Sequence, residues 1–119
     1  MDIVAAIEAE VSTGTTIPKP EASEPFLVKG WGVRRKERAL IYAIPNKRGG
    51  KRYEKGVTES ELRAAFNRLL EFGAFERSWF DENLAACKKE GTCNFTTIGG
   101  LFEVVGQARY EGKGTYRRL

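Results

Sequence analysis

The chain has 119 residues, of which 41% are hydrophobic and 30% are charged, with 20 Lys and Arg against 16 Asp and Glu. This length suits a single folded domain, and this composition is that of a soluble globular protein rather than a disordered one. The chain contains no histidine and only two cysteines, which disfavours a zinc site, a disulfide scaffold and the most common form of acid–base catalysis. We therefore expect no metal, no cofactor and no enzymatic activity.

No apolar run approaches the roughly 20 residues that a membrane-spanning helix needs, and the first residues lack the positive charge of a secretory signal. These features predict a cytoplasmic protein with no membrane partner. The charges are unevenly distributed, because residues 26–119 hold 19 of the 20 Lys and Arg but only 11 of the 16 Asp and Glu. We divide the chain accordingly into an acidic N-terminal leader, residues 1–25, and a basic globular domain, residues 26–119, for which a polyanion is the expected partner.

Within the leader, apolar residues recur at helical spacing and predict a short amphipathic helix over residues 2–11. Residues 12–25 contain three prolines and few large apolar side chains, a composition typical of an extended linker. The apolar stripe of the helix is available to dock on a partner protein or on a second copy of the chain. It consists of Ile3, Val4, Ile7 and Val11.

The basic domain begins with two segments of strand character. Apolar residues alternate with glycines over residues 26–33, which favours an irregular or edge strand. Residues 39–44 are apolar on both alternating faces and predict a buried strand with Tyr42 in the core. The next segment, residues 46–56, holds five Lys and Arg and three Gly, and therefore predicts an exposed basic loop.

Two helices are expected after this loop. The first begins with a capping box at Thr58, continues with apolar residues at helical spacing and ends at Gly73. The second has Ser78 as its N-cap and ends before Gly91.

A third helix and a hairpin complete the predicted domain. The helix begins at Thr96 or Thr97 and ends at Gly106, and its Gly99-Gly100 pair predicts close packing against a neighbouring element. Residues 107–119 contain a Glu-Gly-Lys-Gly turn between two short alternating segments and predict a β-hairpin. The fold class is therefore α+β, with a three-helix core, a small β-sheet and a C-terminal hairpin.

The order of three helices followed by a basic hairpin over residues 58–119 resembles the winged helix-turn-helix family of DNA-binding domains. In that family the third helix enters the major groove and the hairpin, or wing, lies against the adjacent backbone or minor groove. The resemblance implies a reading helix over residues 96–107, with Thr97 on its outward face. It implies wing contacts from Arg109, Lys113, Arg117 and Arg118.

Clusters of Lys and Arg elsewhere in the domain are candidate contacts to phosphate, because each one that meets a phosphate releases a counterion. The alternative is a solvated surface that only keeps the protein soluble. Two lysines near the start of the third helix are further candidates, since a helix N-terminus attracts anions. These candidates are Arg34, Arg35, Lys47, Arg48, Lys51, Arg52, Lys88 and Lys89.

The leading hypothesis is a small, non-catalytic protein that binds nucleic acid, DNA in the first instance, mainly through the phosphate backbone. The alternative is an interaction or accessory module of the kind that mobile elements encode, dimerising or binding a partner through residues 2–11. An enzyme is the third possibility, and it would require a carboxylate or a lysine with a displaced pKa in a cleft.

Overall fold

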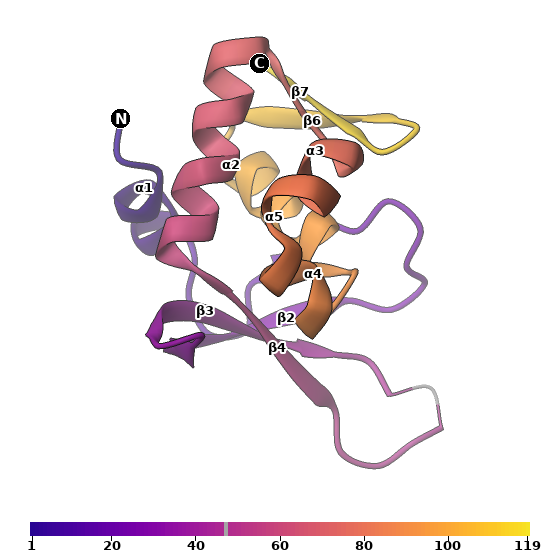
Figure 1. Ribbon diagram of the computed structural model, residues 1–119. Helices are drawn as coiled ribbons and strands as arrows, with labels where there is room; N and C mark the ends of the chain where they lie inside the picture. The colour runs from indigo at the N-terminus through magenta and orange to yellow at the C-terminus, as the bar shows by residue number, and fades with distance from the viewer. Residues whose placement is uncertain (47) are drawn as a thin grey trace.

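The computed structural model describes residues 1–46 and 48–119, and it shows two antiparallel sheets at opposite ends of a group of helices (Figure 1). The larger sheet lies at the bottom of the view and the smaller at the top, so the architecture is α+β. The helices are α1 (Ile3–Glu10), α2 (Glu59–Phe72), α3 (Arg77–Asn83), α4 (Ala85–Glu90) and α5 (Asn94–Val104). The strands are β1 (Thr16–Ile17), β2 (Phe26–Arg34), β3 (Glu37–Ile44), β4 (Tyr53–Thr58), β5 (Ala74–Glu76), β6 (Ala108–Gly112) and β7 (Thr115–Arg118).

The larger sheet has the strand order β1-β2-β3-β4, with every neighbouring pair antiparallel. The predicted buried strand forms the centre of β3, where Leu40 and Tyr42 are fully buried. The expected basic loop is shorter than predicted, because its last residues, from Tyr53 onward, pair with β3 as strand β4. The loop that remains is flanked by two paired strands, which restricts where its cations can lie.

The capping box that begins α2 is confirmed. The Thr58 hydroxyl accepts the backbone N–H of Glu61, and the Glu61 carboxylate accepts the backbone N–H of Thr58 at 2.8 Å. Gly73 ends the helix in the left-handed conformation, with φ of 75°, as a C-terminal glycine commonly does.

The predicted second helix is divided into two short ones. Leu84, with φ of −119° and ψ of 50°, interrupts the helical backbone between α3 and α4. Ser78 is not the N-cap, since α3 already begins at Arg77 and no side chain caps its start. Strand β5, which directly precedes α3, was not anticipated from the sequence.

The third predicted helix, α5, begins at Asn94, two or three residues before the expected start, and it lies in the core along most of its length. The close packing predicted for its glycine pair is confirmed. A Cβ atom on Gly99 would overlap the ring of Tyr116, and one on Gly100 would lie 2.6 Å from the carbonyl oxygen of Pro18. The two glycines therefore let α5 touch the hairpin on one side and the N-terminal segment on the other.

The C-terminal hairpin is confirmed as β6 and β7, which pair through a turn at Lys113 and Gly114. Strand β5 adds to it on the β7 side, so the smaller sheet has the order β5-β7-β6. The ring of Tyr116 in β7 packs against Phe75 of β5 and Phe95 of α5, with ring centroids 6.3 and 5.4 Å apart. This aromatic packing fixes the hairpin on the helical core.

The N-terminal leader is packed against the rest of the chain. Ile3, Val4 and Ile7 of α1 are buried against α2 and α5, and Ile17 of β1 joins the same core. The apolar stripe of residues 2–11 that was expected to face a partner is thus covered by the chain's own helices. Its role is structural, and a dimer formed through this stripe would require α1 to leave the core.

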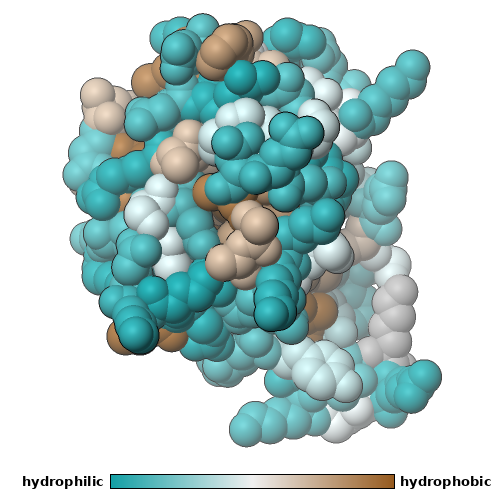
Figure 2. Space-filling view, viewed as in Figure 1, coloured by the Kyte–Doolittle hydropathy of each residue, from teal (hydrophilic) through white to brown (hydrophobic). Residues whose placement is uncertain are grey.

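Figure 2 shows one face of the molecule, on which hydrophilic residues predominate and apolar residues form separate small groups. Among the residues that the structure describes, no helix combines the length and the apolar character that crossing a bilayer requires.

Candidate anion-binding site

The arginines of the β2–β3 turn face carboxylates inside the molecule instead of solvent. Arg35 lies at the tip of the turn with φ of 50°, and its guanidinium donates to Glu61 at 2.7 and 2.8 Å and also to Glu90. Arg34 donates to the other oxygen of Glu90 at 3.0 Å. This network ties the turn to α2 and α4, so both of these predicted phosphate contacts already have carboxylate partners within the chain.

The pKa values of this network agree with these pairings. Burial alone would lower the pKa of Arg35, but its hydrogen bonds to Glu61 and Glu90 raise the pKa by more than burial lowers it. The net shift of the Arg35 pKa is therefore upward. Burial alone would raise the pKa of Glu61, but the hydrogen bonds from Arg35 and from the backbone of Thr58 hold this pKa below its usual range. Both partners are charged at neutral pH, and each neutralises the other.

Three more of the expected contact residues have partners within the chain. Lys88 pairs with Asp81 at 3.6 Å, and Arg117 pairs with Glu111 at 2.8 Å. The Arg117 pair is exposed and therefore weak, whereas the Lys88 pair is partly buried. Thr97 is fully buried, and its hydroxyl lies 2.6 Å from the Nζ of Lys19, so the prediction that it faces a nucleic-acid groove is wrong.

The remaining predicted residues are exposed and lie in three places. The residues Arg48, Lys51 and Arg52 lie in the β3–β4 loop, Lys89 lies on α4, and Arg109, Lys113 and Arg118 lie on the hairpin. Lys47 lies outside the described residues. The Nη1 of Arg52 donates to the carbonyl of Pro25 at 3.3 Å, which places the β3–β4 loop beside the N-terminal segment.

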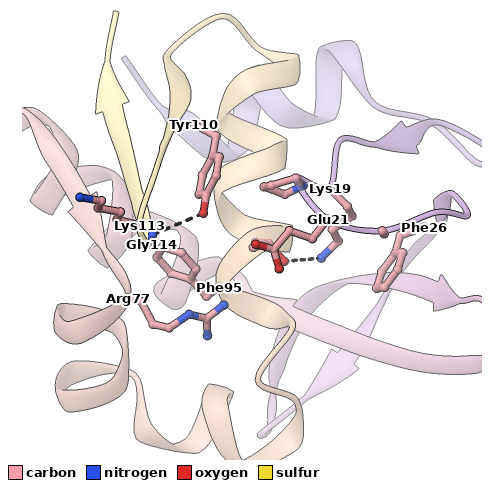
Figure 3. A pocket seen from close by; sticks show the side chains of 11 residues that line it. Lys19, Glu21, Phe26, Arg77, Phe95, Tyr110, Lys113 and Gly114 are labelled. Atoms are coloured by element: carbon pink, nitrogen blue, oxygen red, sulfur yellow. Dashed lines mark hydrogen bonds between the residues drawn. The ribbon is translucent and has the colours of Figure 1, made fainter.

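A pocket lies between this N-terminal segment and the hairpin (Figure 3). It has a volume of about 540 Å³ and lies over the first turn of α5. Figure 1 places the hairpin turn, the segment of residues 18–25 and the β3–β4 loop on the same side of the molecule. The pocket is lined by Lys19, Pro20, Glu21, Ala22, Phe26, Arg77, Phe95, Thr96, Tyr110, Lys113 and Gly114.

Lys19 provides the most unusual charge in this pocket. Its ammonium donates to the carbonyl of Cys93 at 3.0 Å and to the hydroxyls of Thr96 and Thr97 at 2.9 and 2.6 Å. The same nitrogen lies 4.4 Å from the ring centroid of Phe26. All of these partners are neutral, and within the described part of the chain Lys19 forms no ion pair with a carboxylate.

The environment of Lys19 disfavours its charge. Its pKa is lowered to about 7, mainly by burial; Cys93 opposes this shift, and the nearby guanidinium of Arg77 adds to it. The amine also lies at the N-terminal end of α5, where the helix dipole favours a negative charge. An amine with three hydrogen bonds but no counterion thus lies in the pocket, and a bound anion would favour its charged form.

Two further cations lie at the rim of the pocket. The guanidinium of Arg77 stacks over the ring of Phe95 at 4.6 Å, and one of its nitrogens donates to the carbonyl of Thr92. Lys113 is exposed at the tip of the hairpin, beside Gly114, whose N–H donates to the hydroxyl of Tyr110. Neither cation forms an ion pair with another described residue.

One carboxylate faces these three cations. Glu21 is the only acidic residue among the described residues that line the pocket, and it is exposed. Figure 3 places it between Lys19 and Arg77, in front of α5. The pocket therefore has three cations against one carboxylate, a surplus of positive charge that suits an anionic ligand.

Sequence reasoning identified Lys113 but missed Lys19, Arg77 and the pocket itself. Lys19 belongs to the segment that the sequence assigns to the acidic leader. Arg77 lies between the predicted end of the first helix at Gly73 and the predicted N-cap of the second at Ser78. One signal was available in the sequence. Lys19 is the single cation of the leader and lies between two prolines, which restrict the backbone and can hold a side chain in one direction.

Comparison of the chain with family models, with curated proteins and with solved structures finds no match. Among the described residues, no group of three or more Cys, Asp and Glu side chains is placed to hold a metal ion.

Proposed function

We propose that this protein binds nucleic acid through the phosphate backbone, without catalysis, on the side formed by the hairpin, the pocket and the β3–β4 loop. The observation that carries the proposal is the meeting of Lys19, Arg77 and Lys113 at one pocket without ion pairs to described carboxylates. Surplus cations on one side of a protein attract a polyanion at long range and contact its phosphates at short range.

The order of the elements supports a winged-helix-like arrangement. Strand β5 lies between α2 and α3, where winged-helix domains have a short strand, and the β6–β7 hairpin follows α5 in the position of a wing. The hairpin presents Arg109, Lys113 and Arg118 as exposed cations. A wing of this kind contacts the backbone or the minor groove, and it needs no base-specific side chains.

The mode of binding that we propose differs from that of the family at α5. This helix is covered by the N-terminal segment and by the hairpin, and its residues from Phe95 to Phe102 are almost all buried. It therefore has no free face to insert into a major groove. Contacts through the hairpin and the β3–β4 loop favour backbone binding with little base readout.

The β3–β4 loop extends the proposed surface beyond the pocket. Arg48, Lys51 and Arg52 are exposed, and the bond from Arg52 to Pro25 joins their loop to the segment that lines the pocket. Glu21 and Glu24 lie on this same segment and reduce the local positive charge. We place the protein in the cytoplasm as part of the proposal, in keeping with its two free thiols, Cys87 and Cys93.

Fluorescence anisotropy with labelled duplex DNA, single-stranded DNA and RNA, at two salt concentrations, tests the proposal. The site variant is Arg77→Gln/Lys113→Gln, and the control is Lys36→Gln/Arg63→Gln, which removes the same charge away from the pocket. Lys36 is a matched control for Lys113, because both lie in turns with positive φ, 65° and 53°. We expect the site variant to bind at least about tenfold more weakly, with a smaller salt dependence, and the control to change little.

The proposal is wrong if none of the three nucleic acids binds at low salt. It is also wrong if both double variants lose affinity equally, since the binding would then follow the net charge and not this surface. A third variant, Arg48→Gln/Lys51→Gln, tests whether binding depends on the β3–β4 loop alone. A loss of affinity confined to this variant would exclude the pocket from the binding surface.

A further inference from the structure

We infer that the pocket above α5 binds a terminal phosphate monoester, the phosphorylated end of a nucleic-acid strand or a free nucleotide. For a strand end, the inference rests on the proposed function, because it assumes that the protein binds nucleic acid. It adds the chemical group that the pocket recognises, a terminal phosphate. Its basis is a concave site with three cations, Lys19 at the base and Arg77 and Lys113 at the rim, against the single carboxylate of Glu21.

The geometry favours an end group over a phosphate within the strand. The ammonium of Lys19 is partly buried, over the ring of Phe26 and at the start of α5, so a group that projects from a strand approaches it more readily than a continuous backbone does. A terminal phosphate projects from its strand and enters a pocket of about 540 Å³ without bending the chain. A monoester also has three terminal oxygens and close to two negative charges, whereas an internal diester has one charge.

The lack of a counterion for Lys19 also supports the inference. Buried charges in proteins are normally paired, because an isolated one loses its hydration without gaining a counterion. Lys19 has only neutral acceptors, and its lowered pKa of about 7 shows the cost of that arrangement. A phosphate in the pocket would supply the missing negative charge.

Each group in the pocket has a distinct part in this binding. Arg77 keeps free guanidinium N–H groups beside the one that bonds to Thr92, and these suit two phosphate oxygens. Lys113 adds an exposed charge at the mouth of the pocket. Lys19 acts from below as a fixed charge, since its three donors are already used by the protein. Glu21 occupies space that the phosphate would take and opposes its entry.

The opposing carboxylate provides a sharp test, because the chain offers a matched control. Glu21 and Glu24 are both exposed and lie three residues apart on the same segment, but only Glu21 lines the pocket. We expect Glu21→Gln to bind a phosphorylated oligonucleotide about three- to tenfold more tightly than the wild type, and Glu24→Gln to bind it about equally. Lys19→Met is expected to lose most of the preference for phosphorylated ends.

The measurement is the affinity for oligonucleotides of one sequence carrying a 5′-phosphate, a 3′-phosphate or no phosphate, with adenosine monophosphate and inorganic phosphate as competitors. In the wild type we expect about tenfold tighter binding of one phosphorylated end than of the unphosphorylated strand. Competition by the mononucleotide at similar concentrations would show that a free nucleotide is sufficient. Competition that needs the strand would identify the nucleic-acid end as the source of the phosphate.

The outcomes separate this inference from the proposed function. Equal and salt-dependent binding of all three oligonucleotides would overturn the end recognition and leave the backbone binding intact. Failure of every oligonucleotide, with mononucleotide binding that still depends on Glu21, would overturn the proposed function and keep the pocket. Because Lys19→Met could loosen the N-terminal segment, the Glu21→Gln and Glu24→Gln pair decides independently, and equal affinities for that pair would also refute the inference.

Discussion

The close contact between α5 and the hairpin leads to a quantitative expectation for Gly99→Ala. The new methyl group would overlap three ring atoms of Tyr116, all closer than any real Cβ contact. The ring has little room to move, since its centroid lies 5.0 Å from that of Tyr110 and 5.4 Å from that of Phe95. The substitution must therefore displace either α5 or β7.

Two effects of opposite sign determine the magnitude. Forcing an extra methyl group into a packed core costs about 1–3 kcal/mol, and a rigid aromatic neighbour favours the upper end of this range. Replacing Gly by Ala within a helix gains about 1 kcal/mol in helix propensity. Their difference is a net loss of about 2 kcal/mol in the free energy of unfolding of the Gly99→Ala variant.

Equilibrium unfolding in urea measures this loss. With a dependence on urea of about 1–3 kcal/mol per molar, the midpoint should fall by about 1 M. Gly91→Ala is the control, because Gly91 has extended backbone with φ of −169° and its nearest neighbours are the side chains of Cys93 and Lys55, at 3.3 Å or more. A Gly99→Ala protein as stable as the wild type would refute the account of how α5 and the hairpin meet.

Other predictions follow from the same packing and from the ion network. Ile7→Ala should lower the free energy of unfolding by about 2–5 kcal/mol in urea titrations, since Ile7 is fully buried; an effect below about 1 kcal/mol would mean that α1 is not part of the core. Gly100→Ala should displace the carbonyl of Pro18 and weaken the binding of phosphorylated oligonucleotides more than it lowers the unfolding midpoint, and an unchanged affinity would disprove the link. Glu61 has a pKa lowered in the folded state, so its contribution to stability is present above the ordinary pKa of a glutamate and is lost as the pH falls through the lower folded value. Denaturation measured between pH 6 and pH 3 should therefore show a shallower loss of stability in Glu61→Gln than in the wild type, and parallel curves would contradict the role of the Arg35 pair.

Local signals predicted much of the fold. The capping box at Thr58 and the glycine at Gly73 determine their own backbone geometry, so the first predicted helix is correct at both ends. The break at Leu84 was not predictable, because the apolar spacing continues through it and tertiary packing decides where the backbone turns. The start of α5 at Asn94 was not predictable either, because no side chain caps it and the sequence therefore gives no local signal there.

Long-range contacts explain why the candidate site was only partly predicted. A run of Arg and Lys at residues 34–36 looks the same in the sequence whether it faces solvent or carboxylates. The positive φ of Arg35 turns its side chain toward Glu61 and Glu90, which are 26 and 55 residues away in the chain. Charge counts predict a surplus, but the pairing across elements decides which cations remain available.

The glycine pair of α5 connects the core to the candidate site. Gly99 admits the ring of Tyr116 and thereby holds the hairpin that carries Lys113. Gly100 admits the carbonyl of Pro18 on the other side of the helix, and the next residue along the chain is Lys19. The positions of Lys19 and Lys113 relative to α5 therefore depend on two adjacent glycines. The packing of the core beneath the pocket, and not the exposed segments at its rim, sets the geometry of the pocket.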